Sequence, residues 1–170
     1  MIGSGGAGKS TLAARLGERL GLPVVHLDAR YWRPGWAPTP EPEWRATVAR
    51  LAAADAWVVD GNYGGTLDLR LARCDAVVFL DLPRWLCVAR VLRRALRYAG
   101  RTRPDMAPGC PERLTWEFVR WVWDYPRTRR PDILRRLAEL APGTRVTVLR
   151  SRAAVARFLA GLGPDNTTTG

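Results

Sequence analysis

The sequence contains only one histidine, one lysine and three cysteines among its 170 residues. With one histidine and no cluster of metal-ligating residues, a structural zinc site and a serine-hydrolase triad are excluded. The cysteines are odd in number and lack Cys-x-x-Cys spacing, which indicates reduced thiols rather than disulfide bonds. No apolar run approaches the roughly 18 residues of a membrane span, and the N-terminus has no signal-peptide pattern. We therefore expect a cytoplasmic protein with no membrane partner.

The positive charge of the chain is unevenly distributed. The formal net charge is +11. Lys9 is the one lysine, and all other Lys or Arg positions are arginine. Residues 84–136 hold fourteen arginines and five acidic residues, a net charge of +9. Such a segment is typical of a mobile anion-binding element, of a nucleic-acid-binding patch or of a solvated basic surface. Composition leaves these three interpretations open.

A glycine-rich motif begins at the third residue. Residues 3–10 read GSGGAGKS, a full match to G-x-x-x-x-G-K-[ST], in which backbone N–H groups cradle phosphates. Lys9 would reach the β- and γ-phosphates, and the Ser10 hydroxyl would bind Mg²⁺. A flexible glycine-rich end is the alternative, but leucines at helical spacing follow directly, as the motif requires. We therefore predict an ATP-binding loop formed by Gly3, Ser4, Gly5, Gly6, Ala7, Gly8, Lys9, Ser10 and Thr11.

Short apolar runs alternate with helical patterns along the rest of the chain. Four β-branched runs, at 24–27, 57–59, 76–80 and 146–149, have the composition of buried parallel strands. Between them lie an amphipathic segment around Trp44 and longer helical patterns. The sequence therefore predicts an α/β fold with a parallel sheet. The predicted helices include one from Pro83 to about Tyr98 and one from Arg152 to Leu162 with Ser151 as its N-cap.

About 60 residues separate the third predicted strand from the fourth, far more than an ordinary crossover. We expect a helical lid inserted at about 99–130, within one domain spanning 1–163, followed by a disordered tail at 164–170. Only Met1 and Ile2 precede the glycine-rich loop, so the strand that should lead into it is shortened. We therefore expect the natural protein to begin several residues upstream.

Five stretches of the chain together resemble a known family: GSGGAGKST, HLDARYWRPGW, VVDGNYGG, VVFLDLPR and WEFVRWVWDY. They resemble the P-loop kinases of small metabolites, the adenylate-kinase-like group, and within it the bacterial DNA topology modulation proteins. The resemblance runs from Ile2 to about Leu162. It implies a three-layer P-loop fold and Mg²⁺-dependent phosphoryl transfer from ATP to a small molecule, as in nucleoside monophosphate kinases. The alternative is a nucleotide-regulated DNA-binding protein, although no DNA-reading motif is evident.

The resemblance also implies residue roles. Asp60 lies where adenylate kinases carry an aspartate, and it would hold Mg²⁺ opposite Ser10 or simply cap a turn. Arg90 and Arg94 match the R-x-x-x-R at the lid entrance and would stabilise the transferred phosphoryl group with Lys9, unless they lie on a solvated face. The family's arginine four residues after the aspartate is Gly64 here. This difference weakens the case for a nucleoside monophosphate as acceptor.

The residues expected to contact the phosphoryl acceptor follow the first predicted strand. Asp28 ends that strand, at the edge where ligand sites of α/β sheets form. In sugar- and shikimate-type relatives a carboxylate near this position holds the acceptor hydroxyl, and Asp28 would hold it too or act as a base. Trp32 and Trp36 would stack on a flat substrate or pack to fix the loop. His26 is expected to be structural.

Overall fold

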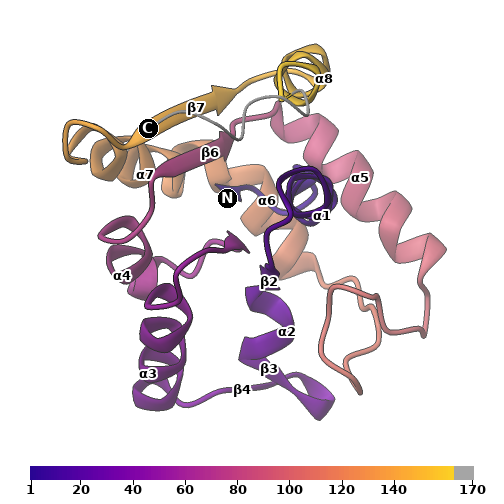
Figure 1. Ribbon diagram of the computed structural model, residues 1–170. Coiled ribbons are helices and arrows are strands. Elements are labelled where there is room, and N and C mark those ends of the chain that lie inside the picture. Colours follow the sequence, from indigo (N-terminus) through magenta and orange to yellow (C-terminus); the bar gives the residue numbers. More distant parts are fainter. Residues whose placement is uncertain (163–170) are drawn as a thin grey trace.

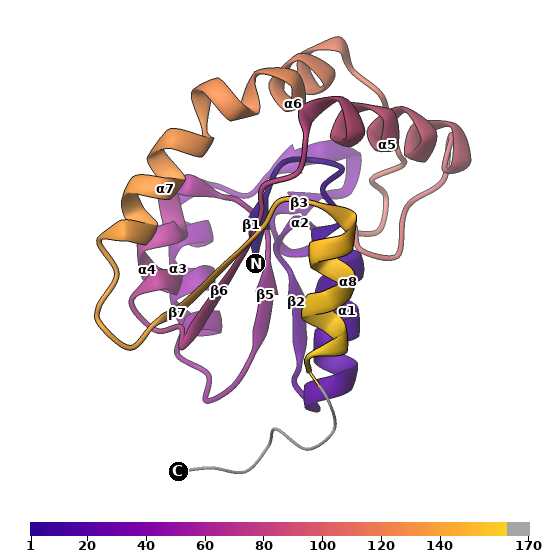
Figure 2. The ribbon, with the colours of Figure 1, turned by 90° about the horizontal axis from the view of Figure 1, so that it is seen from above.

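The computed structural model describes residues 1–162, so the tail predicted at 164–170 lies outside the described residues. Five of its strands, β1, β2, β5, β6 and β7, pair in parallel. One sheet has the order β1-β6-β7, and β2 pairs with β5. The Gly61 N–H donates to the Met1 carbonyl at 3.2 Å, and Figure 2 shows the five strands side by side in the order β2-β5-β1-β6-β7. The strand bounds are β1 (Ile2–Gly3), β2 (Val24–His26), β5 (Val58–Asp60), β6 (Ala76–Leu80) and β7 (Arg145–Leu149).

Helices cover both faces of these strands. Helices α1 and α8 lie on one face, and α3, α4 and α7 lie on the other (Figures 1 and 2). Apolar side chains of each helical layer pack against the strands, which explains why the strand runs are apolar on both sides. The helix bounds are α1 (Lys9–Leu20), α2 (Leu27–Tyr31), α3 (Glu41–Ala52), α4 (Leu67–Leu71), α5 (Arg84–Arg97), α6 (Trp116–Thr128), α7 (Arg130–Ala138) and α8 (Arg152–Ala160).

The predicted α/β class with a parallel sheet is confirmed, and the strand predictions differ from β2, β5, β6 and β7 by one residue or less at each end. Helix α5 starts directly after Pro83, and the Ser151 hydroxyl caps α8 by accepting a hydrogen bond of 3.1 Å from the Ala154 N–H. All three cysteines are free. Among residues 1–162 no helix has the length and apolar character needed to cross a bilayer.

In the chain, three helices, α5, α6 and α7, separate β6 from β7, although the two strands are neighbours in the sheet. Helices α5 and α6 pack against each other and lie above the carboxyl ends of the strands (Figure 2). Residues 98–115 join them without a helix. A second irregular feature, which we did not predict, is a small antiparallel hairpin after α2. It consists of β3 (Trp32–Arg33), a 3₁₀ turn at Pro34–Trp36 and β4 (Ala37–Pro38).

Candidate functional site

The glycine-rich loop between β1 and α1 has a backbone shape that requires glycine. Gly3, Gly6 and Gly8 have φ values of 147°, 75° and 97°. A Cβ atom at Gly3 would lie 2.6 Å from the carbonyl oxygen of Leu80, and one at Gly6 would collide with the carbonyl oxygen of Cys87. The loop therefore turns tightly into the N-terminus of α1, where the first N–H groups of the helix have no intrahelical acceptor.

Lys9 lies at the start of α1 and is half-buried. Its Nζ donates a hydrogen bond of 3.0 Å to the carbonyl oxygen of Ser4, so the side chain folds back along the loop. Burial lowers the pKa of Lys9, while the charges of Asp28 and Asp60 oppose that change. The ammonium group thus lies beside the backbone of the loop.

Asp60, at the end of β5, is 4% exposed. The Nδ1 atom of His26 lies 3.2 Å from its Oδ2 atom. Burial by itself would raise the pKa of Asp60, but contact with His26, the charge of Lys9 and the Ser10 hydroxyl outweigh it and hold that pKa below its usual value. Asp60 therefore remains a carboxylate close to Lys9 and Ser10. His26, expected to be structural, is a direct neighbour of this carboxylate.

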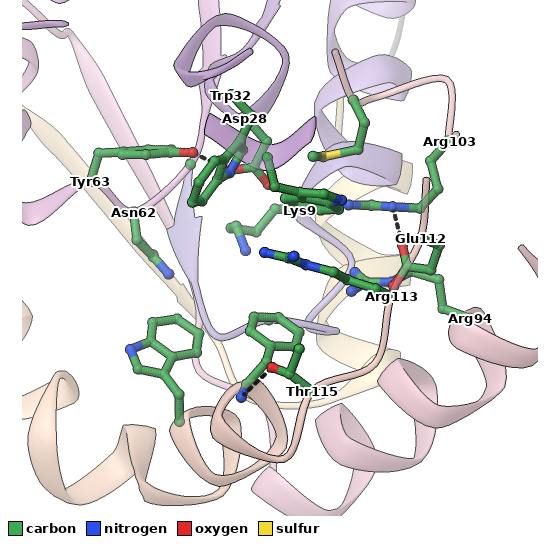
Figure 3. A pocket seen from close by; sticks show the side chains of 16 residues that line it. Lys9, Asp28, Trp32, Asn62, Tyr63, Arg94, Arg103, Glu112, Arg113 and Thr115 are labelled. Carbon is green, nitrogen blue, oxygen red and sulfur yellow. Dashed lines mark hydrogen bonds and ion pairs between the residues drawn. The ribbon is translucent and has the colours of Figure 1, made fainter. Parts of the chain in front are cut away.

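A cavity of about 360 Å³ opens in front of the loop (Figure 3). It is lined by residues of the 98–115 segment, of α6, of the hairpin and of the loop after β5. It brings together six of the predicted site residues: Gly5, Lys9, Asp28, Trp32, Trp36 and Arg94. Its remaining walls include Gly61, Asn62, Tyr63, Arg103, Met106, Glu112, Arg113, Thr115, Phe118 and Trp121. Ser10, Asp60 and Arg90 do not line it. Its volume is within the range of small-molecule sites.

One wall of the cavity contains a hydrogen-bonded pair. The hydroxyl of Tyr63 donates a hydrogen bond of 2.6 Å to Oδ1 of Asp28 (Figure 3). Burial raises the pKa of Tyr63, and the nearby Asp28 raises it further, so the phenol stays a neutral donor. Tyr63 has a φ of 35°, a left-handed conformation that is unusual for a tyrosine. Such strain persists only where the surroundings hold it.

The side chain of Arg70 supplies that support. Arg70 is 5% exposed, and its guanidinium donates to the carbonyl oxygens of Gly61, Asn62 and Tyr63 at 2.9, 2.5 and 3.3 Å. Burial lowers its pKa to about 10. The Oδ1 atom of Asn62 in turn accepts a hydrogen bond of 3.1 Å from the Gly3 N–H. Arg70 therefore fixes the loop that joins the Tyr63 side of the cavity to the glycine-rich loop.

The two arginines predicted at the lid entrance have different surroundings. The guanidinium of Arg90 donates to the carbonyl oxygens of Ala7 at 3.0 Å and Gly6 at 3.4 Å, so it contacts the loop backbone. Arg94 lines the cavity, and its Nε donates to Oε1 of Glu112 at 3.1 Å. Burial lowers the pKa of Arg94, which remains a cation. We did not predict Glu112, whose side chain is 3% exposed.

Both tryptophans of the hairpin line the cavity and also fix their loop. They pack against Met106, Ala107 and Cys110 of the 98–115 segment. The Nε1 atom of Trp36 donates a hydrogen bond of 3.0 Å to the carbonyl oxygen of Pro111. The two roles that the sequence left open for Trp32 and Trp36 are therefore compatible in this fold.

No group of three or more histidine, cysteine or acidic side chains within residues 1–162 is arranged to hold a metal ion. The oxygen donors near Lys9 are the Ser10 hydroxyl and the Asp60 carboxylate, whose buried Oδ2 atom accepts no hydrogen bond of regular geometry. Oxygen donors of this kind suit Mg²⁺, which usually keeps several waters and binds through few protein ligands together with phosphates. The donor types present are thus compatible with a magnesium ion.

No protein-family model matches the chain. The chain is 30% identical over 126 residues to the uncharacterized protein YqaC of Bacillus subtilis (strain 168). The match covers 72% of this chain and 68% of that protein. The name of that relative assigns it no activity. The extent of the match nevertheless shows common ancestry over most of both chains, and the protein described here belongs to the same family as YqaC.

Proposed function

We propose that this protein is a P-loop kinase that uses ATP and Mg²⁺ to phosphorylate a hydroxyl group of a small molecule. The observation that carries the proposal is the cavity that joins Lys9 to Asp28. Lys9 is a cation suited to a donor phosphate, and Asp28 is a carboxylate suited to an acceptor hydroxyl. Both line the same cavity. Kinases need both groups at one reacting centre.

The donor side is the glycine-rich loop with the N-terminus of α1. Backbone N–H groups and the positive end of the helix bind the phosphates of ATP, and Lys9 moves from the Ser4 carbonyl to the β- and γ-phosphates. Because Lys9 is half-buried, its charge acts on the phosphates with less screening than in open water. Arg90 acts through the loop, since its guanidinium holds the carbonyl groups of Gly6 and Ala7.

Ser10 and Asp60 would hold Mg²⁺, with Asp60 acting through water. The ion would neutralise charge on the β- and γ-phosphates. The lowered pKa of Asp60 keeps this carboxylate ionised at neutral pH. His26 orients Asp60 from the side of β2.

The acceptor side is formed by Asp28 and Tyr63. Asp28 takes the proton of the acceptor hydroxyl as its oxygen forms a bond to the γ-phosphorus. The bond between the γ-phosphorus and the bridging β–γ oxygen breaks at the same time, and ADP leaves. A carboxylate at this position repels a phosphate acceptor, and Gly64 stands where adenylate kinases hold the acceptor phosphate with arginine. The acceptor atom is therefore a hydroxyl oxygen.

The experiment that tests this proposal measures transfer from γ-labelled ATP to a panel of nucleosides, nucleotides and small alcohols in the presence of Mg²⁺. We expect label in a hydroxyl compound. Asp28→Asn should lower the transfer rate and leave ATP affinity unchanged, whereas Asp55→Asn, at an exposed acid outside the cavity, should alter neither. Failure of every acceptor, or full activity of Asp28→Asn, would refute the proposal.

A nucleotide-regulated DNA-binding protein is the second candidate. The observation that favours it is a set of exposed arginines on α5, α6 and the 98–115 segment, beside Trp116, which is 75% exposed. Basic and aromatic groups together suit nucleic acids. Specific binding with a steep salt dependence would support this candidate. Weak, sequence-independent binding that disappears near physiological salt would leave only the kinase.

A further inference from the structure

The charges that line the cavity do not cancel. Four cationic side chains and two carboxylates face it. Glu112 bridges Arg94 at 3.1 Å and Arg103 at 2.6 Å, and Asp105 contacts Arg103 at 2.8 Å. The other carboxylate, Asp28, accepts its hydrogen bond from a neutral tyrosine.

Two cations remain, Lys9 and Arg113. Lys9 belongs to the donor side, next to the glycine-rich loop. Arg113 forms no ion pair with any of residues 1–162. In Figure 3 its side chain extends from the 98–115 segment into the middle of the pocket, on the side of Lys9. This charge is therefore available to a ligand.

The guanidinium of Arg113 is held in position by Trp36. Its central carbon lies 4.9 Å from the centroid of the Trp36 ring, at cation–π distance. Two hydrogen bonds restrict the ring. Its Nε1 atom donates to the carbonyl oxygen of Pro111, and the neighbouring Gly35 N–H donates to the Gly109 carbonyl at 2.9 Å. An arginine that stacks on a ring keeps its N–H edges free, and these edges match the geometry of a carboxylate or phosphate.

The walls between Asp28 and Arg113 are aromatic. Trp32 and Trp36 meet edge to face at 5.4 Å on one side, and Phe118 and Trp121 stack at 5.9 Å on another. Aromatic walls favour a flat, apolar body between the polar ends of a ligand. The cavity thus offers a carboxylate for a hydroxyl group, flat walls for a ring and an unpaired guanidinium for an anion.

We infer that the acceptor is a ring-containing hydroxyl compound with an anionic group, a carboxylate or a phosphate, which Arg113 binds above Trp36 while Asp28 contacts the hydroxyl. This inference rests on the proposed function, because it takes the cavity as the acceptor site. Arg113 is exposed at the rim of the cavity, so its charge stays hydrated with an uncharged ligand, and only an anionic ligand gains an ion pair with it.

Three probes that differ only in their charged end test the inference: para-hydroxymethylbenzoate, para-hydroxymethylphenyl phosphate and the neutral para-hydroxymethylbenzamide. Binding is measured without nucleotide, by calorimetry and by tryptophan emission. We expect at least one anionic probe to bind roughly tenfold or more tightly than the amide, as a charge-assisted bond predicts. The anionic probe that binds more tightly shows whether the site prefers a carboxylate or a phosphate.

The variant Arg113→Gln should remove this preference and leave the affinity for the amide unchanged. The matched control is Arg120→Gln, at a mainly exposed arginine of α6 that does not line the cavity, and it should keep the preference. Equal binding of acids and amide, binding of none of the three, or a preference that survives Arg113→Gln would overturn the inference.

Label transfer from ATP separates this inference from the proposed function. Transfer to an uncharged acceptor at an equal rate in Arg113→Gln would retain the kinase and overturn the anion site. An anion preference that Arg113→Gln removes, in a protein that transfers no label, would retain the anion site and overturn the kinase.

Discussion

Oδ1 of Asp28 accepts a hydrogen bond of 2.6 Å from the hydroxyl of Tyr63, although 35 positions separate the two residues in the chain. Asp28 follows β2 and Tyr63 follows β5, and these strands are paired in parallel. Carboxyl ends of parallel strands meet at one edge of a sheet, so strand pairing brings the two side chains together. The bond orients the carboxylate toward the cavity that also contains Lys9.

The variant Tyr63→Phe tests the value of this bond. The ring remains, so the fold should be retained, but the carboxylate loses its orienting donor. Because hydrogen bonds to charged groups contribute about 1.5–3 kcal/mol, we expect phosphoryl transfer to fall roughly 10- to 100-fold. Steady-state kinetics should show the loss in kcat, with KM for ATP unchanged. A kcat equal to that of the wild type would show that Tyr63 has no role in the reaction.

Gly6 and Gly21 form a matched pair for testing the loop. Both have a positive φ, 75° and 64°, but a Cβ atom at Gly21 has no atom within 4 Å, whereas one at Gly6 meets the carbonyl of Cys87. Gly21→Ala should therefore lower stability by only about 1–2 kcal/mol. Gly6→Ala adds a collision with backbone and should also weaken nucleotide binding. Denaturant titration and nucleotide calorimetry measure both effects. Equal behaviour of the two variants would contradict the loop geometry.

Arg70 is expected to act on stability and on activity together. Arg70→Met leaves the carbonyl groups of Gly61 and Asn62 without a donor, each of which costs about 1–3 kcal/mol when unsatisfied, whereas the Tyr63 carbonyl keeps the Thr66 N–H. We expect a loss of at least about 2 kcal/mol in the free energy of unfolding and a lower kcat, since Tyr63 is no longer held. Arg73→Met, at an exposed neighbour, is the control and should be neutral. Stability and kcat both equal to the wild type would exclude this positioning role.

Glu112 should be important for the order of the 98–115 segment. Its side chain is almost fully buried between Arg94 and Arg103, and Glu112→Gln leaves those two cations without their shared partner. Removing one partner of a buried ion pair is strongly destabilising, by about 3 kcal/mol or more. Hydrogen exchange of residues 98–115 should then accelerate. Glu139→Gln, in an exposed pair with Arg135, should leave exchange unchanged. Unaltered exchange in both variants would show that the segment does not depend on this pair.

The regular part of the fold was predictable because it leaves periodic signals. Buried parallel strands appear as short β-branched runs, and amphipathic helices show a repeat of 3.6 residues. The hairpin at Trp32 and the 98–115 segment leave no such signal. They are held by single contacts between distant positions, such as that of Trp36 with Pro111, which no local pattern encodes.

The candidate site likewise contains residues that the sequence indicated and residues that it did not. Lys9 and Ser10 belong to a local motif, and Asp28 follows a recognisable strand, so the sequence indicated them. Tyr63 and Arg113 depend on how separate segments approach one another, and nothing in their neighbourhoods distinguishes them from other loop residues. Arg113 was one of fourteen arginines in the basic segment, and its place in the lining of the cavity and its contact with Trp36 set it apart.

The central claim is that the glycine-rich loop and Lys9 bind the phosphates of ATP. Calorimetric titration of the purified protein with ATP in the presence and absence of Mg²⁺, alongside Lys9→Met, tests it most directly. We expect one site per chain in the wild type, tighter binding with Mg²⁺, and loss of measurable binding in Lys9→Met at unchanged melting temperature. A wild-type protein that binds no nucleotide, or a Lys9→Met variant that binds as tightly as the wild type, would contradict the account.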